Sequence, residues 1–218
     1  GAAGMRRVLI FCVLAVVCAV PALGAEIAVP GLDQVWEEAE GIVEFLREHH
    51  ITPKMILLTH GHFDHVGAVK DLQKEYPGLP VYIAREDQEL LEGDDKTGAL
   101  GRRFIRNQDP YTFQADGCLR EGEDLTLDEL TVKVMATPGH TKGSVCLFCG
   151  STIFSGDTLF LHDCGRTDLY GGSFPEICNS LRRLAALERD YTVRPGHGEL
   201  TSIEEERGWI DALLEKYQ

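Results

Sequence analysis

The stretch Thr59-His60-Gly61-His62-Phe63-Asp64-His65 places three histidines and an aspartate within six positions, directly after the apolar run Met55-Ile56-Leu57-Leu58. An apolar run without charge predicts a buried strand in the middle of a sheet. The cluster then lies in the loop at the carboxyl end of that strand, where α/β sheets commonly place their active sites. Because imidazole and carboxylate are ligands that suit zinc and iron, the stretch predicts a metal site.

The overall composition is that of an ordinary globular protein, with 44% hydrophobic and 26% charged residues. A formal net charge of −14 would repel a nucleic-acid backbone, so we predict no nucleic-acid partner. We interpret the acidity as a matter of solubility. Much of it lies in the runs Glu86-Asp87, Glu121 to Asp124 and Glu204-Glu205-Glu206, which we expect to be solvated faces.

Seven cysteines, an odd number, stand at scattered positions and do not form a disulfide framework. This usage favours a reducing compartment, so we predict a cytoplasmic protein. Cys146 and Cys149 have the spacing of a zinc knuckle, but the sequence offers no second pair to complete four ligands. Both accompany the apolar run Val145 to Phe148, and we interpret them as packing residues of a strand.

The amino-terminal segment allows two interpretations. Residues 1–4 resemble a cloning remnant, so we predict one domain over residues 5–218. The basic start Met5-Arg6-Arg7, the apolar run Val8 to Val20 and the small residues that follow have the composition of a secretory signal. The same run also predicts two β-strands, since Val, Ile, Phe and Cys dominate it. It is short for a membrane span, so we predict no membrane partner and keep secretion as the alternative location.

Hydrophobic periodicity divides the rest of the chain into helices and strands. Helices are predicted over residues 34–49, 66–76, 85–91, 174–187 and 202–216. Strands are predicted over residues 26–29, 55–58, 80–84, 125–127, 130–135, 144–149, 152–155 and 191–194. The weakly patterned segment 93–122 is expected to be a long loop, in which Tyr111 and Phe113 either contact a substrate or pack on the core. Strands in two batches, each mixed with helices, predict an α+β fold: a four-layer αββα sandwich with half-domains near 5–130 and 131–218.

Four later segments place ligand-type side chains after strand-like runs. Three are Thr137-Pro138-Gly139-His140-Thr141, Ser155-Gly156-Asp157-Thr158 and Pro195-Gly196-His197-Gly198, and the fourth is Cys164-Gly165-Arg166-Thr167-Asp168. Glycine beside each histidine lets the backbone turn sharply and brings the ligand close. One such loop would be weak support for a metal site, whereas all of them in one short chain are strong support.

With these motifs the sequence resembles the metallo-β-lactamase superfamily, in its branch of single-domain, glyoxalase II-like (hydroxyacylglutathione hydrolase-like) hydrolases. The resemblance covers nearly the whole chain from about Glu26 onward and extends to Met5. Members of this family carry a β-hairpin before the first histidine motif. The resemblance therefore strengthens the strand interpretation of residues 8–20.

Carried over by motif, the resemblance implies that His60, His62 and His140 hold one metal ion. Asp64, His65 and His197 would hold a second ion, with Asp157 bridging both and with Asp64 and Asp157 in catalytic roles. The cofactors implied are two divalent ions, zinc first, with iron or manganese as alternatives. The implied reaction is hydrolysis of a small thioester of the hydroxyacylglutathione type by a metal-bound hydroxide, so the expected partner is a small molecule.

Some positions depart from the family pattern. Arg166 and Asp168 stand where glutathione-using members carry a lysine and a tyrosine, so they either contact substrate or pair to stiffen their loop. Val29 replaces the usual aspartate of an Asp-Pro-Gly motif, a supporting position rather than a ligand. The sequence leaves open the acyl group, the thiol carrier, the metal in vivo and the oligomeric state.

A second function class remains open. Persulfide dioxygenases of the same superfamily bind one iron through the equivalents of His60, His140 and Asp157, a two-histidine, one-carboxylate set. Cys164 to Asp168 and Glu204 to Arg207 resemble those enzymes, whereas Pro195 to Gly198 is closer to the hydrolases. True β-lactamase activity is less favoured, because many of those enzymes have a cysteine where Asp157 stands.

Overall fold

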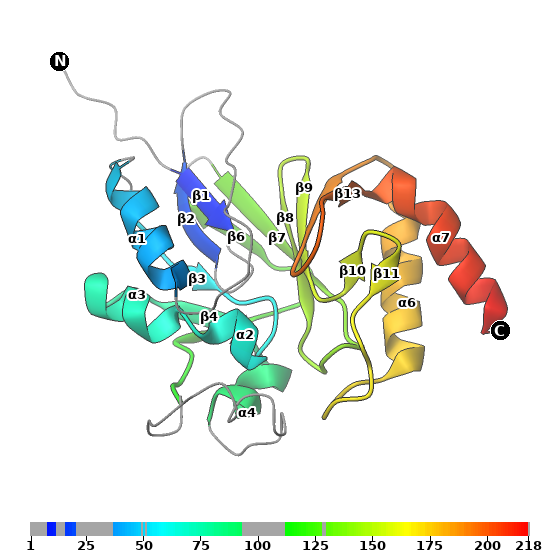
Figure 1. Ribbon diagram of the computed structural model, residues 1–218, viewed down its shortest axis with the longest axis horizontal. Helices are drawn as coiled ribbons and strands as arrows, with labels where there is room; N and C mark the ends of the chain where they lie inside the picture. The colour runs from blue at the N-terminus through cyan, green and yellow to red at the C-terminus, as the bar shows by residue number, and fades with distance from the viewer. Residues whose placement is uncertain are drawn as a thin grey trace.

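Two β-sheets pack against each other in the centre of the molecule, and helices cover their outer faces (Figure 1). The computed structural model describes residues 8–11, 16–20, 37–48, 50, 52–92, 112–127 and 130–217. The four layers are those of the predicted αββα sandwich, so the predicted fold class is confirmed.

The first sheet holds five strands in chain order. They are β1 (Val8–Phe11), β2 (Val16–Val20), β3 (Ile56–Leu57), β4 (Val81–Ala84) and β5 (Gly117–Leu119). β1 and β2 pair antiparallel, as the strand interpretation of this segment predicts, and β2 pairs antiparallel with β3. β3, β4 and β5 run parallel, so the loops after β3 and β4 leave the same edge of the sheet.

The second sheet follows the order β13-β12-β9-β8-β7-β6. Its strands are β6 (Asp124–Leu127), β7 (Leu130–Ala136), β8 (Val145–Cys149), β9 (Thr152–Gly156), β12 (Thr192–Pro195) and β13 (Thr201–Ser202). All neighbours are antiparallel except β9 and β12, which run parallel. A small separate hairpin joins β10 (Leu159–Phe160) to β11 (Asp163–Cys164).

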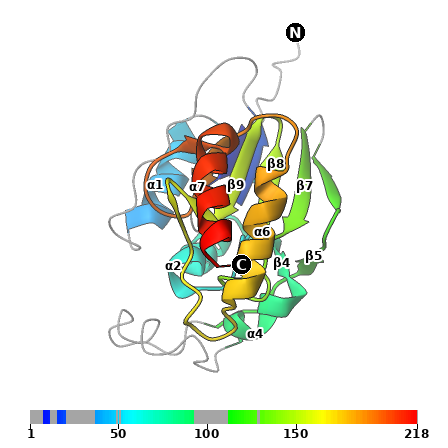
Figure 2. The ribbon, with the colours of Figure 1, turned by 90° about the vertical axis from the view of Figure 1, so that its right-hand side faces the viewer.

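Helices from the two parts of the chain form the outer layers. On the first sheet lie α1 (Glu37–Glu48), α2 (Phe63–Val66), α3 (Val69–Glu75), the 3-10 turn η1 (Arg85–Asp87) and α4 (Gln88–Leu91). On the second sheet lie α6 (Phe174–Ala185) and α7 (Ile203–Lys216), which run side by side in Figure 2. No helix within the described residues is both long enough and apolar enough to cross a membrane.

Three apolar clusters hold the layers together. Leu46 of α1 and Leu72 of α3 pack on Ile83 of the first sheet, and all three side chains are fully buried. Behind the second sheet, buried side chains of α6 and α7 pack on strands β8, β9 and β12. Between the sheets, Leu57 and Leu147 belong to a third cluster, which joins the two halves directly.

Several predicted elements need correction. The helix predicted over 66–76 is two helices, α2 and α3, and α2 begins inside the histidine motif itself. The segment predicted as a loop contains β5, whose three residues are too few to show a periodic pattern. The chain passes from the first sheet to the second between Leu119 and Asp124, and the half-domain division near residue 130 stays a prediction. The predictions for residues 1–4, 26–29 and Tyr111 lie outside the described residues, while Phe113 packs against the first cluster.

The two cysteines with knuckle spacing are packing residues, as predicted. Cys146 is fully buried in the cluster behind the second sheet, and Cys149 packs at the cluster between the sheets. Burial raises the pKa of each thiol to about 11, so both stay protonated at neutral pH.

The acidic run 204–206 is not a uniformly solvated face, contrary to the prediction. Glu206 is fully buried, while Glu204 is exposed. The Glu206 carboxylate accepts hydrogen bonds from the Thr201 hydroxyl at 2.6 Å and from the backbone N–H of His162 at 2.9 Å. A buried charge needs such partners, so Glu206 ties the β10–β11 hairpin to α7.

We expect Glu206→Ala to lower the free energy of unfolding by about 2 kcal/mol, because hydrogen bonds to a charged group are lost and buried donors lose their acceptor. Urea unfolding of the metal-free protein measures this effect. Glu204→Ala, two residues away on the same helix, is the matched control and should change the midpoint little. Equal midpoints for the two variants would mean that the buried carboxylate is not stabilising.

Candidate metal centre

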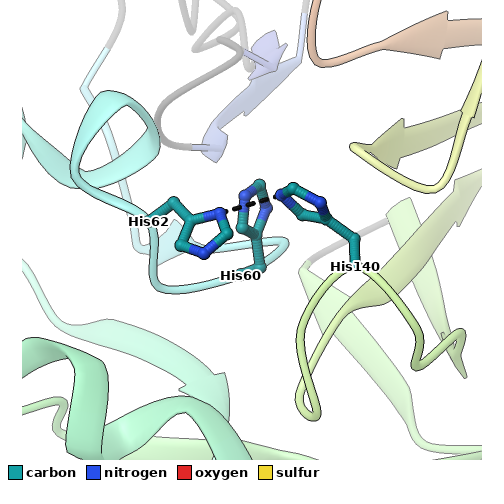
Figure 3. A group of neighbouring side chains, drawn as sticks. All are labelled: His60, His62 and His140. Atoms are coloured by element: carbon teal, nitrogen blue, oxygen red, sulfur yellow. Dashed lines mark hydrogen bonds between the residues drawn. The ribbon is translucent and has the colours of Figure 1, made fainter. Parts of the chain in front are cut away.

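His60, His62 and His140 come together from the two halves of the molecule. His60 and His62 lie in the loop after β3, and His140 lies in the loop after β7. Figure 3 shows the three rings turned toward one another. Nδ1 of His62 lies 2.8 Å from Nε2 of His140. All three side chains are buried. The sequence predicted these three residues as one ligand set, and the structure brings them together.

The surrounding backbone fixes how the rings face. Nδ1 of His140 donates to the backbone carbonyl of Arg166 at 2.7 Å, so Nε2 of that ring carries the lone pair and faces Nδ1 of His62. Nδ1 of His60 lies 3.3 Å from the Thr59 hydroxyl. Gly139 has a φ of +141°, and a Cβ there would overlap the backbone of Ile177 in α6. Only glycine therefore fits the turn that presents His140.

A second set, Asp64, His65 and His197, lies beside the first. Asp64 and His65 belong to α2, and His197 follows β12. Nε2 of His197 is 3.2 Å from Nε2 of His65 and 3.2 Å from Oδ2 of Asp64. His65 is fully buried, whereas Asp64 and His197 are about half exposed. This set therefore has one side open to solvent.

Asp157 follows β9 and stands between the two sets. Its Oδ2 lies 3.5 Å from Nε2 of His140 in the first set and 3.5 Å from Nε2 of His197 in the second. Its Oδ1 lies 3.2 Å from Nε2 of His65. The parallel pairing of β9 with β12 places the two loops side by side, and Gly196 donates its N–H to the Gly156 carbonyl at 2.6 Å. One carboxylate thus faces both sets.

The donor set fits metal ions. Three groups within the described residues could each hold one: His60 with His62 and His140, Asp64 with His65 and His197, and a group of His60, His65 and Asp157 that spans the two. Tetrahedral zinc with bonds near 2.1 Å places its ligand atoms about 3.4 Å apart, close to the separations observed. Within the described part of the chain, Nε2 of His60 and Nε2 of His62 are buried without a hydrogen-bond partner. Buried polar atoms are rarely left unpaired, so the buried histidines of this centre are suited to bind a cation.

The electrostatics differ between the two sets. Burial, followed by the charge of His65, holds the pKa of His60 well below its usual value, and burial lowers the pKa of His62 to about 4. Hydrogen bonds to Asp157 and Asp64 raise the pKa of His197 to about 10. Burial would raise the pKa of Asp157, but the charge of His65 and hydrogen bonds from His197 and His65 outweigh it and hold that pKa well below its usual value. The first set is neutral and the second is rich in charge.

Arg166 and Asp168 form a two-pronged ion pair. Nε and Nη2 of Arg166 donate to Oδ1 and Oδ2 of Asp168, each at 2.7 Å, on the exposed surface. Since each side chain is engaged by the other, the geometry favours the stiffening role over direct substrate contact. The carbonyl of Arg166 already orients His140, so a stiff loop here supports the first set.

The sequence interpretation missed Asp87. It was assigned to a solvated acidic run, yet it is buried between the loops that carry His60, His62 and His140. Burial raises the pKa of Asp87, while hydrogen bonds from Thr141, Gly61 and Gly143 oppose the shift. The one available signal was its position after β4, at the edge of the sheet where the loop after β3 also emerges.

The fold and the donor set define a class of protein, and comparison with known sequences agrees. Residues 31–197 match the metallo-beta-lactamase superfamily domain, and the chain belongs to this superfamily.

Relatives include proteins of several descriptions. An uncharacterized protein of Mycobacterium leprae is 38% identical over 170 residues, 74% of this chain and 77% of that protein. A probable metallo-hydrolase of Bacillus subtilis, YqgX, is 31% identical over 169 residues, 76% of this chain and 78% of that protein. The hydroxyacylglutathione hydrolase of Edwardsiella ictaluri is 33% identical over 162 residues, 73% of this chain but 53% of that enzyme.

Solved structures show the same fold. The B3 metallo-beta-lactamase BLEG-1 superposes with a TM-score of 0.69 at 36% identity, over 82% of this chain and 83% of that one. TTHA1623 in a di-iron-bound form gives a TM-score of 0.66 at 37% identity, over 78% and 82% of the two chains. ETHE1 from Myxococcus xanthus gives a TM-score of 0.63 at 24% identity, over 96% and 89%, which speaks for the fold alone.

Proposed function

We propose that the protein is a hydrolase with two divalent metal ions that cleaves a small thioester of the hydroxyacylglutathione type. The observation that carries the proposal is the place of Asp157, whose Oδ2 is equidistant from a histidine of each ligand set. One carboxylate shared by two complete sets is what two neighbouring cations need, because each requires charge compensation from the same anion. Zinc is the first choice for histidine and carboxylate ligands, with iron or manganese next.

The chain's own residues would then divide the work. His60, His62 and His140 would hold one ion, Asp64, His65 and His197 the other, and Asp157 would face both. Ions bound there would supply an acidic water as nucleophile and polarise the substrate carbonyl. Asp64, half exposed at the open side of the centre, would accept a proton there in the proposed reaction. The pairing of Arg166 with Asp168 would keep the loop behind His140 rigid during turnover.

The names of the relatives support hydrolysis as the reaction more strongly than they support any particular substrate. A named metallo-hydrolase and a named hydroxyacylglutathione hydrolase both exceed 30% identity. The chain spans about half the length of that hydroxyacylglutathione hydrolase, so the thioester remains part of the proposal. Iron as the metal has support from the di-iron form of TTHA1623.

An oxidoreductase with one iron, of the persulfide dioxygenase kind, is the second candidate. His60, His140 and Asp157 would supply two histidines and one carboxylate, and Oδ2 of Asp157 lies 3.5 Å from Nε2 of His140. The second set argues against it. Asp64, His65 and His197 are all present and converge, which a single iron would not require.

Metal analysis combined with substrate assays separates the candidates. We expect protein purified without added metal to contain about two divalent ions per chain and to hydrolyse S-lactoylglutathione. One iron per chain with oxygen consumption on glutathione persulfide would overturn the proposal in favour of the dioxygenase. A cephalosporin assayed in parallel tests β-lactamase activity, and cleavage of the β-lactam without cleavage of the thioester would also overturn it.

A further inference from the structure

Asp87 is a buried carboxylate that links the loops carrying the first ligand set. Its Oδ2 accepts the backbone N–H of Gly61 at 2.9 Å, and Gly61 stands between His60 and His62. Its Oδ1 accepts the backbone N–H of Gly143 at 2.7 Å, three residues after His140. Oδ2 also accepts the hydroxyl of Thr141, directly after His140, at 2.7 Å.

The hydrogen atoms of this network can point only one way. All three groups around Asp87 act as donors, so the carboxylate serves as an acceptor on both oxygens. Because the Thr141 hydroxyl donates to Asp87, the Ser144 hydroxyl 2.7 Å away must donate to Thr141. The Ser144 oxygen in turn accepts the backbone N–H of Thr141 at 3.1 Å. The loop after His140 is thus closed on itself and tied to Asp87.

Glycines at positions 61 and 143 let the two loops approach the segment that carries Asp87. A Cβ at position 143 would lie 2.7 Å from the Asp87 carboxylate carbon, closer than van der Waals contact allows. At position 61 a Cβ would lie 2.8 Å from the Cβ of Leu90 in α4. Each loop therefore approaches the η1–α4 segment through a glycine, one from each half of the molecule.

From these contacts we infer that Asp87 is a positioning residue for the first metal: it holds the His60–His62 loop and the His140 loop at the separation that one ion requires. These hydrogen bonds of Asp87 go only to residues in the loops that carry ligands of the first set. Asp64, His65 and His197 lie on α2 and after β12, and none of the three groups that donate to Asp87 adjoins His65 or His197. This inference rests on the proposed metal centre, and it predicts that Asp87 affects one ion and not the other.

The test measures zinc affinity at each set separately, by competition with a chromophoric chelator. Asp87→Asn keeps the side-chain size but turns an NH₂ group toward a backbone N–H, so at least one hydrogen bond is lost. In a His197→Ala background, where only the first set is complete, we expect zinc affinity to fall about 10- to 100-fold. In a His140→Ala background, where only the second set is complete, the same substitution should change affinity less than about 3-fold. Glu86→Gln, an exposed neighbour on η1, is the matched control in both.

Thr141→Val provides a second variant that removes one hydroxyl and keeps the shape, and it should lower affinity at the first set in the same direction but by less. If Asp87→Asn does not fold, the zinc affinity of Thr141→Val at the first set tests the inference by itself. Equal losses at both sets would reduce Asp87 to a general stabilising role and overturn the inference. Wild-type affinity at the first set in both variants would overturn it while leaving the proposed function standing. Failure of the wild-type chain to bind zinc would reject the metal centre and this inference together.

Discussion

We expect Asp157→Ala to lower the turnover number at least about 10³-fold and to remove most of the bound metal. The reason is that Asp157 faces both ligand sets, with Oδ2 3.5 Å from His140 and from His197. Without it, neither ligand set would keep the carboxylate that faces both, and ions bound there would lose its charge compensation. Inductively coupled plasma mass spectrometry gives metal per chain, and thioester hydrolysis gives turnover.

Two further variants test whether the charge of Asp157 is responsible and whether the effect is specific to this carboxylate. Asp157→Asn keeps the shape and removes the charge, so it should resemble alanine in activity if charge is what matters. Asp211→Ala, an exposed carboxylate on α7, should leave metal content and turnover as in the wild type. Metal content and turnover unchanged in Asp157→Ala would reject the site assignment altogether.

Metal affinity should depend on pH differently at the two ligand sets. In the first set the pKa of His62 is lowered to about 4, and the pKa values of His60 and His140 also lie below the usual value, so an ion binds there with little proton release near neutrality. In the second set the pKa of His197 is raised to about 10, so an ion must displace its proton. Each displaced proton changes apparent affinity tenfold per pH unit, which is about 100-fold between pH 8 and pH 6.

The direction of the pH dependence follows from the raised pKa of His197. Affinity at the second set falls as the pH falls, because a raised histidine pKa keeps the competing proton bound. The charge of Asp157 outweighs burial and also raises the pKa of His65, which steepens the dependence. Calorimetric zinc titrations at pH 6, 7 and 8, in buffers of different ionisation enthalpy, count the protons released at each step. Equal proton release at both steps would contradict the prediction.

The positions of the candidate metal ligands were predictable because ligand-type residues follow apolar strands. His60, His140, Asp157 and His197 each come after such a run, and β-sheet geometry brings strand ends to a common edge. The four-layer arrangement followed from strands in two batches. Short elements such as β5 and β10 were not predictable, since two or three residues carry no periodicity.

Asp87 and Glu206 mark the limit of sequence reasoning. Each lies in an acidic run that also contains an exposed carboxylate, Glu86 for Asp87 and Glu204 for Glu206, and the residue types do not distinguish buried from exposed. What separates them is a set of backbone and hydroxyl donors contributed by distant segments, which only the folded chain assembles. A buried acid of this kind therefore looks like a solvated one until its partners are placed.

The candidate ligands come from loops of both sheets, and this affects how firmly the two sheets are held together. The loop after β3 joins the second sheet through the backbone N–H of Val145, which donates to the Thr59 carbonyl at 2.9 Å, and His60 and His140 meet just beyond that bond. An ion bound by His60 and His140, 80 positions apart in the chain, would act as a removable cross-link between two packed sheets. Sliding or opening of one sheet against the other would break the ligand set before it broke either sheet, so loss of metal would be the earliest sign that the halves are coming apart.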